Sequence, residues 1–259
     1  MLAPQLSVIV ITHNEALNIS DCLQSVSFAD ECVVVDSGST DATVALARAA
    51  MAQVVTTPDW PGFGPQKNRA LALARGDWVL ALDADERVTK ALQAEILDVL
   101  SAPIHDAYEL PRLSSFCGHF IRHSGWYPDH NVRLFRRRVG RFSPDLVHER
   151  VLVCAGSTGR LKTPLVHLSY ADDDVYLRKL QQYSSLGSEQ AYARGKRGGL
   201  GTALVHAAAA FLRSFFFKHG WLDGRAGLMV AISSGESSYH KYFKLMLLTE
   251  AGKRIDELR

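Results

Sequence analysis

The chain has 259 residues, of which 47% are hydrophobic, and a formal net charge of +2 at pH 7. This length and apolar content suit one α/β domain with an appendage, and they exclude long disordered stretches. The small basic excess excludes a general nucleic-acid binder, but basic residues gather in two clusters, which indicates a local anionic partner. The clusters are Arg133, Arg136, Arg137, Arg138 and Arg141, and then Arg194, Lys196 and Arg197.

The cysteines and the N-terminus both indicate a cytoplasmic protein. The four cysteines are widely spaced and form no CxxC pair, so we expect reduced thiols rather than a zinc site or a disulfide framework. The first residues show neither the basic region nor the cleavage site of a secretory signal peptide. The cysteines are Cys22, Cys32, Cys117 and Cys154.

Apolar strands alternate with helical patterns through the first ninety residues. This rhythm predicts a doubly wound, mostly parallel sheet with helices on both faces, in which ligands bind at the carboxyl ends of the strands. Ser39, Thr40 or Asp41 is expected to cap the second helix. The predicted strands are 6–11, 31–35, 54–56 and 77–82, and the predicted helices are 16–26, 42–52 and 64–74. Short strands and loops are expected over 107–168, and helices from 172 onward.

Two carboxylates bracket one small residue directly after a buried strand, in residues 80–86 (LALDADE). Asp83 and Asp85 are suited to a hard divalent ion, which proteins hold with one or two carboxylates together with substrate phosphates. The alternative is that both only cap the helix that starts near Thr89.

A second polar loop, residues 36–41 (DSGSTD), also follows a strand and enters a helix. Backbone N–H groups at a helix N-terminus suit phosphate, and an aspartate at a strand end suits a ribose hydroxyl or a base edge. Turn and cap chemistry for Asp36 and Asp41 is the alternative. The sequence has no GxGxxG and no GK[ST] segment, so neither a Rossmann dinucleotide site nor a P-loop is indicated.

These segments, in this order and spacing, resemble the family 2 glycosyltransferases of the GT-A fold. The resemblance implies that Thr12, Asn14, Glu15 and Asp36 hold the uracil and ribose of a UDP-sugar. Four ordered motifs over most of residues 6–90 make it specific. They are 7–15 (SVIVITHNE), 33–41 (VVVDSGSTD), 66–70 (QKNRA) and 82–86 (LDADE).

The resemblance also assigns the rest of the donor site. Lys67 and Arg69 are expected near the donor, although Lys67 also reads as a solvated helix residue. Asp83 is expected to face the ribose or the sugar, and Asp85 to bind Mg²⁺ or Mn²⁺ between the two phosphates. Such an ion stabilises the charge that develops on a diphosphate leaving group.

The second half must supply a base for the acceptor hydroxyl if the reaction is a single displacement with inversion, as is usual in this family. The resemblance assigns this role to Glu149. Many relatives carry a Glu-Asp pair where this chain has His148-Glu149, so Asp145 remains a competitor, and Asp129 is a further carboxylate nearby. His167 falls where many GT-A enzymes have a late histidine that completes the metal shell, but a histidine at a strand end also serves structural roles.

A narrower resemblance runs almost the length of the chain, to bacterial lipopolysaccharide core glycosyltransferases that add glucose to an inner-core heptose. It implies a UDP-glucose donor and a lipopolysaccharide acceptor. Trp126 and Tyr127 are read either as a sugar platform or as core. The motifs are 124–129 (SGWYPD), 133–136 (RLFR), 147–149 (VHE) and 217–228 (FKHGWLDGRAGL), before a helix that carries Tyr239, Lys241, Tyr242 and Lys244.

Other functions remain open at this point. The same donor chemistry could serve a polyprenyl-linked glycan or a peptide, or the chain could be a non-catalytic nucleotide-sugar-binding module. A nucleotidyltransferase is disfavoured, because residues 12–15 (THNE) lack a Gly-rich loop with a basic residue. The oligomeric state is not indicated.

The expected organisation is a GT-A domain over 1–170, with a nucleotide-sugar half (1–105) and an acceptor half (106–170), and a helical region over 171–259. Residues 203–217 are strongly apolar but shorter than the roughly 20 residues of a spanning helix. With basic residues nearby, this segment could lie in the plane of the anionic inner leaflet. Alternatively, it is a buried helix packed on the sheet domain or on another subunit.

Overall fold

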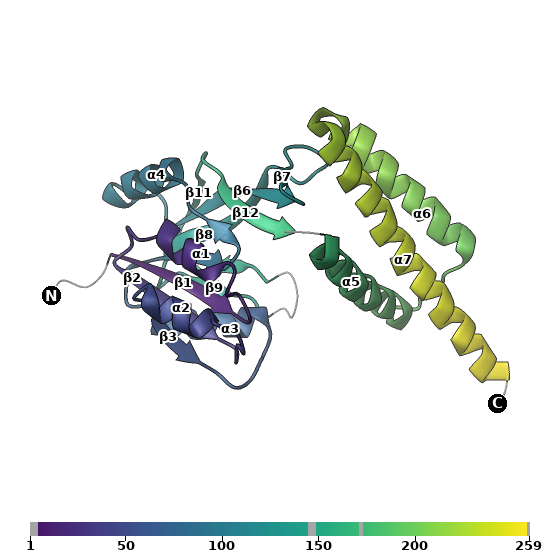
Figure 1. The fold of residues 1–259 in the computed structure, drawn as a ribbon, viewed down its shortest axis with the longest axis horizontal. Coiled ribbons are helices and arrows are strands. Elements are labelled where there is room, and N and C mark those ends of the chain that lie inside the picture. The colour runs from purple at the N-terminus through teal and green to yellow at the C-terminus, as the bar shows by residue number, and fades with distance from the viewer. Residues whose placement is uncertain (1–4, 145–148, 171–172, 258–259) are drawn as a thin grey trace. The chain divides into compact units, whose positions relative to one another are not determined.

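The structure is a computed structural model that describes residues 5–144, 149–170 and 173–257. Its internal contacts divide the chain into two compact units, which Figure 1 shows with their elements labelled. The sheet unit comprises Met1–Leu113 and Asp129–His167. The helical unit comprises Ser114–Pro128 and Leu168–Arg259.

Four parallel strands form the first half of the sheet unit, in the order β3-β2-β1-β4. Thr12 lies opposite Asp36, and Ile11 lies opposite Asp83, so the polar residues that follow these strands share one edge of the sheet. The strands are β1 (Leu6–Thr12), β2 (Glu31–Asp36), β3 (Gln53–Thr56) and β4 (Trp78–Asp83).

Alternating side chains of these strands are buried on opposite faces. Val8 and Val10 pack in one core with the first, second and fourth helices, whereas Ile9 packs in another core with the third helix. Because both faces are covered, the strands are apolar almost throughout. The helices are α1 (Ile19–Ser25), α2 (Thr43–Ala49), α3 (Phe63–Leu73) and α4 (Lys90–Ser101).

The second half of the sheet is mixed, because β8 pairs antiparallel with both β4 and β6. The predicted α/β class, with a largely parallel sheet covered by helices on both faces and a helical C-terminal region, is confirmed. The remaining strands are β5 (Glu86–Arg87), β6 (Ala107–Phe116), β7 (His119–Phe120), β8 (Asp129–Arg136), β9 (Gly140–Phe142), β10 (Val151–Val153), β11 (Thr158–Arg160) and β12 (Leu165–Tyr170).

Two predictions about helix caps are corrected. Ala42 is the N-cap of α2 and offers no side-chain bond; the Asp41 carboxylate instead accepts the Thr43 backbone N–H at 3.0 Å. Thr89 caps α4, because its hydroxyl accepts the Leu92 N–H at 3.2 Å. Asp83 and Asp85 therefore do not cap this helix, and the capping alternative for the acid-x-acid segment is wrong.

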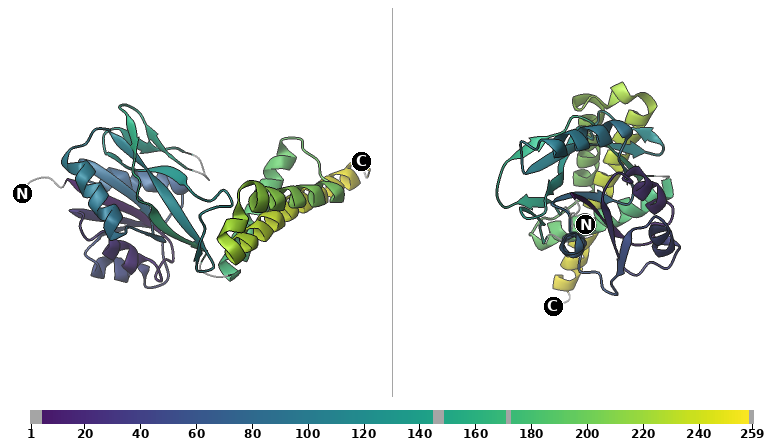
Figure 2. Two further views of the ribbon diagram at one scale, coloured as in Figure 1. Left: turned by 90° about the horizontal axis from the view of Figure 1, so that it is seen from above. Right: turned by 90° about the vertical axis from the view of Figure 1, so that its left-hand side faces the viewer.

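The helical unit is built on three long helices, of which α6 and α7 lie side by side in Figures 1 and 2. The His206 ring stacks on the Tyr242 ring at 3.8 Å, and Tyr176 donates a hydrogen bond to Glu236 at 3.0 Å, which joins α5 to α7. The elements are α5 (Asp173–Ala193), α6 (Leu200–Leu212), a π-helical turn η1 (Arg213–Phe217), a 3₁₀ turn η2 (Gly220–Asp223) and α7 (Gly224–Glu257).

The apolar segment predicted over 203–217 is longer than expected. Within the described parts of the chain, the stretch Leu200–Phe217 is long and apolar enough to cross a membrane by length and composition. Only 11% of it is buried, so the core of the helical unit covers little of it, and packing on the sheet domain or on another subunit stays a prediction. The apolar face of α6 is largely open.

Candidate active site

The loops that follow β1 and β2 are joined by hydrogen bonds and form a loop pair at the carboxyl edge of the sheet. Asp36 is fully buried, and its carboxylate accepts hydrogen bonds from the Thr12 hydroxyl (2.9 Å), the Gly38 and Ser39 N–H groups (3.0 and 2.8 Å) and the Ser39 hydroxyl. Asn14, which has a positive φ of 57°, accepts the Thr40 N–H at 2.8 Å. Asp36 thus shapes the loop pair.

Glu15 completes this loop pair. Its N–H donates to the Thr43 hydroxyl at 2.8 Å, and its carboxylate accepts the Asn18 amide at 2.8 Å. The structure therefore brings together all four residues expected to hold the nucleoside, Thr12, Asn14, Glu15 and Asp36.

Lys67 joins two carboxylates that are far apart in the sequence. Its ammonium lies 2.7 Å from Asp83 Oδ1 and 2.7 Å from Glu149 Oε1. Lys67 is only 4% exposed, so the interpretation as a solvated helix residue is wrong. The bridge places Glu149, the expected base, beside the aspartate at the end of β4.

Arg133 of β8 completes this charge network from the other side. Its Nη2 lies 2.8 Å from Asp83 Oδ2 and 2.6 Å from Glu86 Oε1. Glu86 is fully buried and also accepts the Asp83 N–H at 2.9 Å. Both oxygens of Asp83 are therefore engaged by cations of the protein.

These contacts determine which side chains around Lys67 are ionised. Burial opposes ionisation of Asp83, but the charges of Lys67 and Arg133 outweigh burial and hold the pKa of this carboxyl well below its usual range. Burial also disfavours the Lys67 ammonium, yet Asp83 and Glu149 raise the pKa of Lys67. Burial raises the pKa of Glu86, and the charge of Arg133 opposes this only in part. The Lys67–Asp83 pair is therefore fully ionised near neutral pH.

Asp85 pairs with a different partner. Strand β5 pairs antiparallel with β12, which places His167 opposite Glu86 and brings His167 Nε2 to 3.3 Å from Asp85 Oδ2. Two ligands of an octahedral ion bound at about 2.1 Å are about 3 Å apart, so these two atoms fit neighbouring coordination positions. In the described part of the chain, no group of three or more His, Cys, Asp or Glu side chains could hold a metal. Substrate phosphates and water would have to provide the other ligands.

Comparison with known families decides the class of this site. The sequence model of glycosyl transferase family 2 matches residues 7–156, which include the loop pair, Lys67, Asp83, Asp85 and Glu149. The chain belongs to glycosyl transferase family 2. This family 2 transferase is therefore an enzyme, and the interpretations as a nucleotidyltransferase or a non-catalytic module are set aside.

Relatives of this transferase cover most of its length. It is 30% identical to the lipopolysaccharide core biosynthesis glycosyltransferase LpsC of Rhizobium meliloti (strain 1021), over 88% of this chain and 87% of the relative. It is 28% identical to a glycosyltransferase of Rickettsia bellii (strain RML369-C), over 96% and 88%. A solved glucosyl-3-phosphoglycerate synthase from Mycobacterium tuberculosis, in complex with Mn²⁺, UDP and glucosyl-3-phosphoglycerate, is 29% identical over 44% of this chain and 45% of that chain, with a TM-score of 0.36.

Arg69, expected near the donor of this transferase, does not contact the Lys67 network in the described part of the chain. Arg69 forms an ion pair with Asp59 at 2.7 Å and donates to Gln66 at 3.0 Å, and Gln66 in turn donates to Ser37 in the loop after β2. Arg69 thus supports the loop pair from α3. Asp145, the competing base, lies outside the described residues.

Sequence reasoning missed Arg133 and Glu86. Arg133 belongs to the basic cluster that predicts an anionic partner, but it is buried against carboxylates of the same chain. Arg136 of this cluster pairs with Asp106 and lies over the Trp78 ring. One signal was present: three acids at the end of a buried strand require a buried cation.

Trp126 and Tyr127, for which the sequence allows a sugar platform or a core position, lie in the helical unit. Trp126 packs against Phe116 and Tyr170, with ring centroids 5.9 Å apart in both cases, so it belongs to the core of that unit. Arg122 lies over the Tyr127 ring at 5.8 Å.

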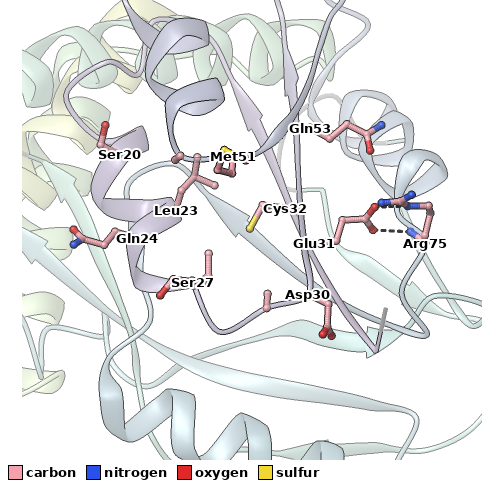
Figure 3. Close-up of a pocket in the computed structure, with 13 residues that line it drawn as sticks. Ser20, Leu23, Gln24, Ser27, Asp30, Glu31, Cys32, Met51, Gln53 and Arg75 are labelled. Atoms are coloured by element: carbon pink, nitrogen blue, oxygen red, sulfur yellow. Dashed lines mark hydrogen bonds and ion pairs between the residues drawn. The ribbon is translucent and has the colours of Figure 1, made fainter. Parts of the chain in front are cut away.

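The hollow shown in Figure 3 is remote from this chemistry. It has a volume of about 500 Å³ and is lined by the first residues of β2, Glu31 and Cys32, and by Arg75. These residues lie at the amino ends of the parallel strands. Burial raises the pKa of the Cys32 thiol to about 11, so this cysteine is unreactive at neutral pH.

Proposed function

We propose that this enzyme is an inverting hexosyltransferase that transfers glucose from UDP-glucose to an inner-core heptose of lipopolysaccharide. The observation that carries the proposal is the Lys67 bridge, which joins the donor-side carboxylate Asp83 to Glu149 through two contacts of 2.7 Å. The relation to LpsC, whose name states lipopolysaccharide core biosynthesis, supports the acceptor class.

The loop pair around Asp36 would hold the nucleoside, because its backbone is fixed by hydrogen bonds to the buried Asp36 carboxylate. Asp85 and His167 would hold Mg²⁺ or Mn²⁺, which when bound supplies a Lewis acid for the diphosphate. Asp83 would face the sugar. Its carboxylate is held ionised by Lys67 and Arg133 and is 32% exposed at the side chain.

Glu149 would act as the base. The acceptor hydroxyl oxygen attacks the anomeric carbon, the bond from that carbon to the diphosphate oxygen breaks, and UDP leaves with the electron pair. The hydroxyl proton passes to Glu149, whose Oε1 is fixed by Lys67. Attack from the face opposite UDP inverts the anomeric centre.

The donor site is tested by calorimetry of UDP and UDP-glucose, with Mn²⁺ and with a chelator. We expect metal-dependent binding that Asp85→Ala abolishes and that Asp98→Ala, at an exposed position on α4, leaves unchanged. Absence of UDP binding under every condition would overturn the donor site.

The base is tested by transfer assays on variants that still bind UDP. Glu149→Gln should lower kcat by about 10²- to 10⁴-fold with little change in UDP affinity. Asp145→Asn, assayed in parallel, decides between the two carboxylates. Core-truncated lipopolysaccharide, a polyprenyl-linked glycan and a peptide, offered as separate acceptors, decide the acceptor class.

A further inference from the structure

The helical unit carries an apolar stripe that its own core leaves uncovered. On α6 the stripe lies on the side away from the buried Ala203, where Leu204, Val205 and Leu212 are exposed, and it continues through η1 and η2. The exposed fractions are 55% for Leu204, 54% for Phe216 and 78% for Phe217. The exposed apolar residues of this surface are Leu200, Leu204, Val205, Leu212, Phe216, Phe217, Trp221 and Leu222.

Basic residues flank the stripe at both ends. All six of them are exposed, and the only acidic residue in the sequence between 194 and 225 is Asp223. The Asp223 carboxylate is already engaged, because it accepts the Arg122 and His123 N–H groups at 3.1 and 2.8 Å and contacts the His123 ring at 2.8 Å. The surface is therefore both apolar and cationic. Its basic residues are Arg194, Lys196 and Arg197 before the stripe, Arg213 and Lys218 within it, and Arg225 after it.

From these observations we infer that α6 and the turn that follows it dock this enzyme on an anionic lipid bilayer, with the helix lying in the plane of the interface. Apolar and aromatic side chains enter the boundary between headgroups and acyl chains, and the flanking cations contact anionic headgroups. The inference goes beyond the transfer reaction. It rests on the proposed function in one respect only: the use of membrane binding would be access to a lipid-linked acceptor.

The neighbouring helix argues against a spanning arrangement. Helix α7 packs along α6, where Tyr242 stacks on His206, and it carries Glu236, Lys241 and Lys244 along the same stretch. A spanning α6 would bring these charged groups into hydrocarbon, at a high cost. An in-plane helix leaves them on the side away from the lipid.

Charge also argues against a second copy of the chain as the occupant. In a twofold contact the same surface meets itself, so basic ends would face either each other or the apolar stripe. The one acid of this surface, Asp223, already has partners, so it offers little compensation. A bilayer that contains anionic lipid supplies the missing negative charge.

The test uses the full chain and sedimentation with vesicles, without any sugar nucleotide. We expect binding to vesicles of phosphatidylethanolamine and phosphatidylglycerol, weak binding to phosphatidylcholine, and release at about 1 M salt, where the Debye length is about 3 Å. Phe216→Ser with Phe217→Ser should weaken binding at least about tenfold. Arg213→Gln with Lys218→Gln should weaken it about thirtyfold on the anionic vesicles.

Matched controls keep the two proposals separable. Met51→Ser with Ile104→Ser replaces residues of the sheet unit that are 91% and 85% exposed, and it should leave vesicle binding unchanged. All variants should bind UDP like the wild type if the donor site is as proposed. Loss of UDP binding in the wild type with intact vesicle binding would overturn the donor site alone.

Tryptophan quenching gives a second measurement. Brominated lipid should quench the wild type and Trp60→Phe alike, because Trp60 is equally exposed but lies in the sheet unit, whereas Trp221→Phe should lose the quenching. The inference is overturned if the wild type does not bind anionic vesicles, or if the variant with Phe216→Ser and Phe217→Ser binds them as tightly as the wild type. A dimer in analytical ultracentrifugation that this variant dissociates, without vesicle binding, would identify the surface as a subunit interface.

Discussion

Lys67 forms ion pairs with two carboxylates of the site. It is buried between Asp83 and Glu149, 2.7 Å from each, so it fixes both negative charges in one place. A buried cation in this position acts as a positioning residue, because each carboxylate would otherwise repel the other.

Replacing this cation tests that role. Lys67→Met should lower kcat at least about 100-fold while UDP binding changes little, because it frees Glu149 but leaves Asp83 paired with Arg133. Removing one partner of a buried ion pair also costs about 3–5 kcal/mol of stability. The measurements are steady-state kinetics, UDP calorimetry and thermal melting.

Lys90→Met, at an exposed position beside Gln93, is the control and should leave all three measurements unchanged. Lys67→Arg should restore part of kcat if the positive charge is what matters. A Lys67→Met enzyme with normal kcat would show that the bridge has no part in the reaction.

The residues of this site were predictable to different degrees. Asp83, Asp85 and the loop residues follow strands, and strand ends can be read from the local sequence. The Lys67–Glu149 contact spans 82 positions, and no local pattern records a contact at that separation. The same reason explains why the sequence does not reveal the role of Arg133: its carboxylate partners lie on two other strands, 47 and 50 positions earlier.

At the scale of elements, Glu31 joins β1, β2 and the turn before β4. Its carboxylate accepts the Ser7 hydroxyl, the Arg75 N–H at 2.9 Å and the Arg75 guanidinium at 2.6 Å, and the Ser7 oxygen in turn accepts the Gly76 N–H at 2.8 Å. Figure 3 shows the Glu31–Arg75 contacts. The charge of Glu31 therefore stabilises the amino ends of the strands.

Glu31→Gln should lower the free energy of unfolding at pH 7 by about 1–3 kcal/mol. Burial raises the pKa of Glu31, but the Ser7 and Arg75 bonds outweigh it and hold the pKa below its ordinary value of 4.5. This stabilisation is fully present above about pH 4.5 and is lost as the pH falls towards the folded-state value. Urea unfolding from pH 7 to pH 3 should show the wild type and the variant converge. A difference that stays constant with pH would contradict the role of the charge.

A glycine determines the turn between α6 and α7. A β-carbon at Gly227 would lie 1.7 Å from the backbone oxygen of Gly220 and 3.1 Å from the β-carbon of Asp223, so it has no room. Gly227→Ala should lower the stability of the helical unit by at least about 2 kcal/mol. Gly201→Ala on α6, where a β-carbon meets nothing within 4 Å, should instead stabilise by about 0.5–1 kcal/mol. Thermal melts followed by circular dichroism check both, and a neutral Gly227→Ala would contradict the close approach.

Most elements of the sheet unit could be predicted, because a strand that is buried on both faces needs apolar residues throughout. Such strands are recognisable in the sequence as short β-branched runs, for example Leu6–Thr12. Helix ends were less predictable: α1 begins at Ile19 rather than at Ala16, because the Glu15 region is used to bind the loop after β2. The sequence alone could not decide between an open and a buried α6, since an apolar helix has the same composition whether protein or lipid covers it.

At the scale of the whole molecule, a transfer site and a lipid-binding surface on one chain make the physical state of the acceptor matter. If the helical unit docks on anionic lipid, it holds the enzyme where a lipid-linked acceptor is concentrated. The enzyme and the acceptor then meet on the membrane surface rather than in bulk solution, at a higher effective concentration. Acceptor in vesicles and acceptor in detergent should then give different kinetics with the same site residues.

This difference can be measured with core-truncated lipopolysaccharide and UDP-glucose. For acceptor embedded in anionic vesicles, Phe216→Ser with Phe217→Ser should lower kcat/KM at least about tenfold, because binding falls by that factor. For the same acceptor in detergent the variant should match the wild type, and Met51→Ser with Ile104→Ser should match it in both. Equal losses in vesicles and in detergent would place the two phenylalanines in folding or catalysis instead. No loss in either would mean that the bilayer contact does not deliver the acceptor.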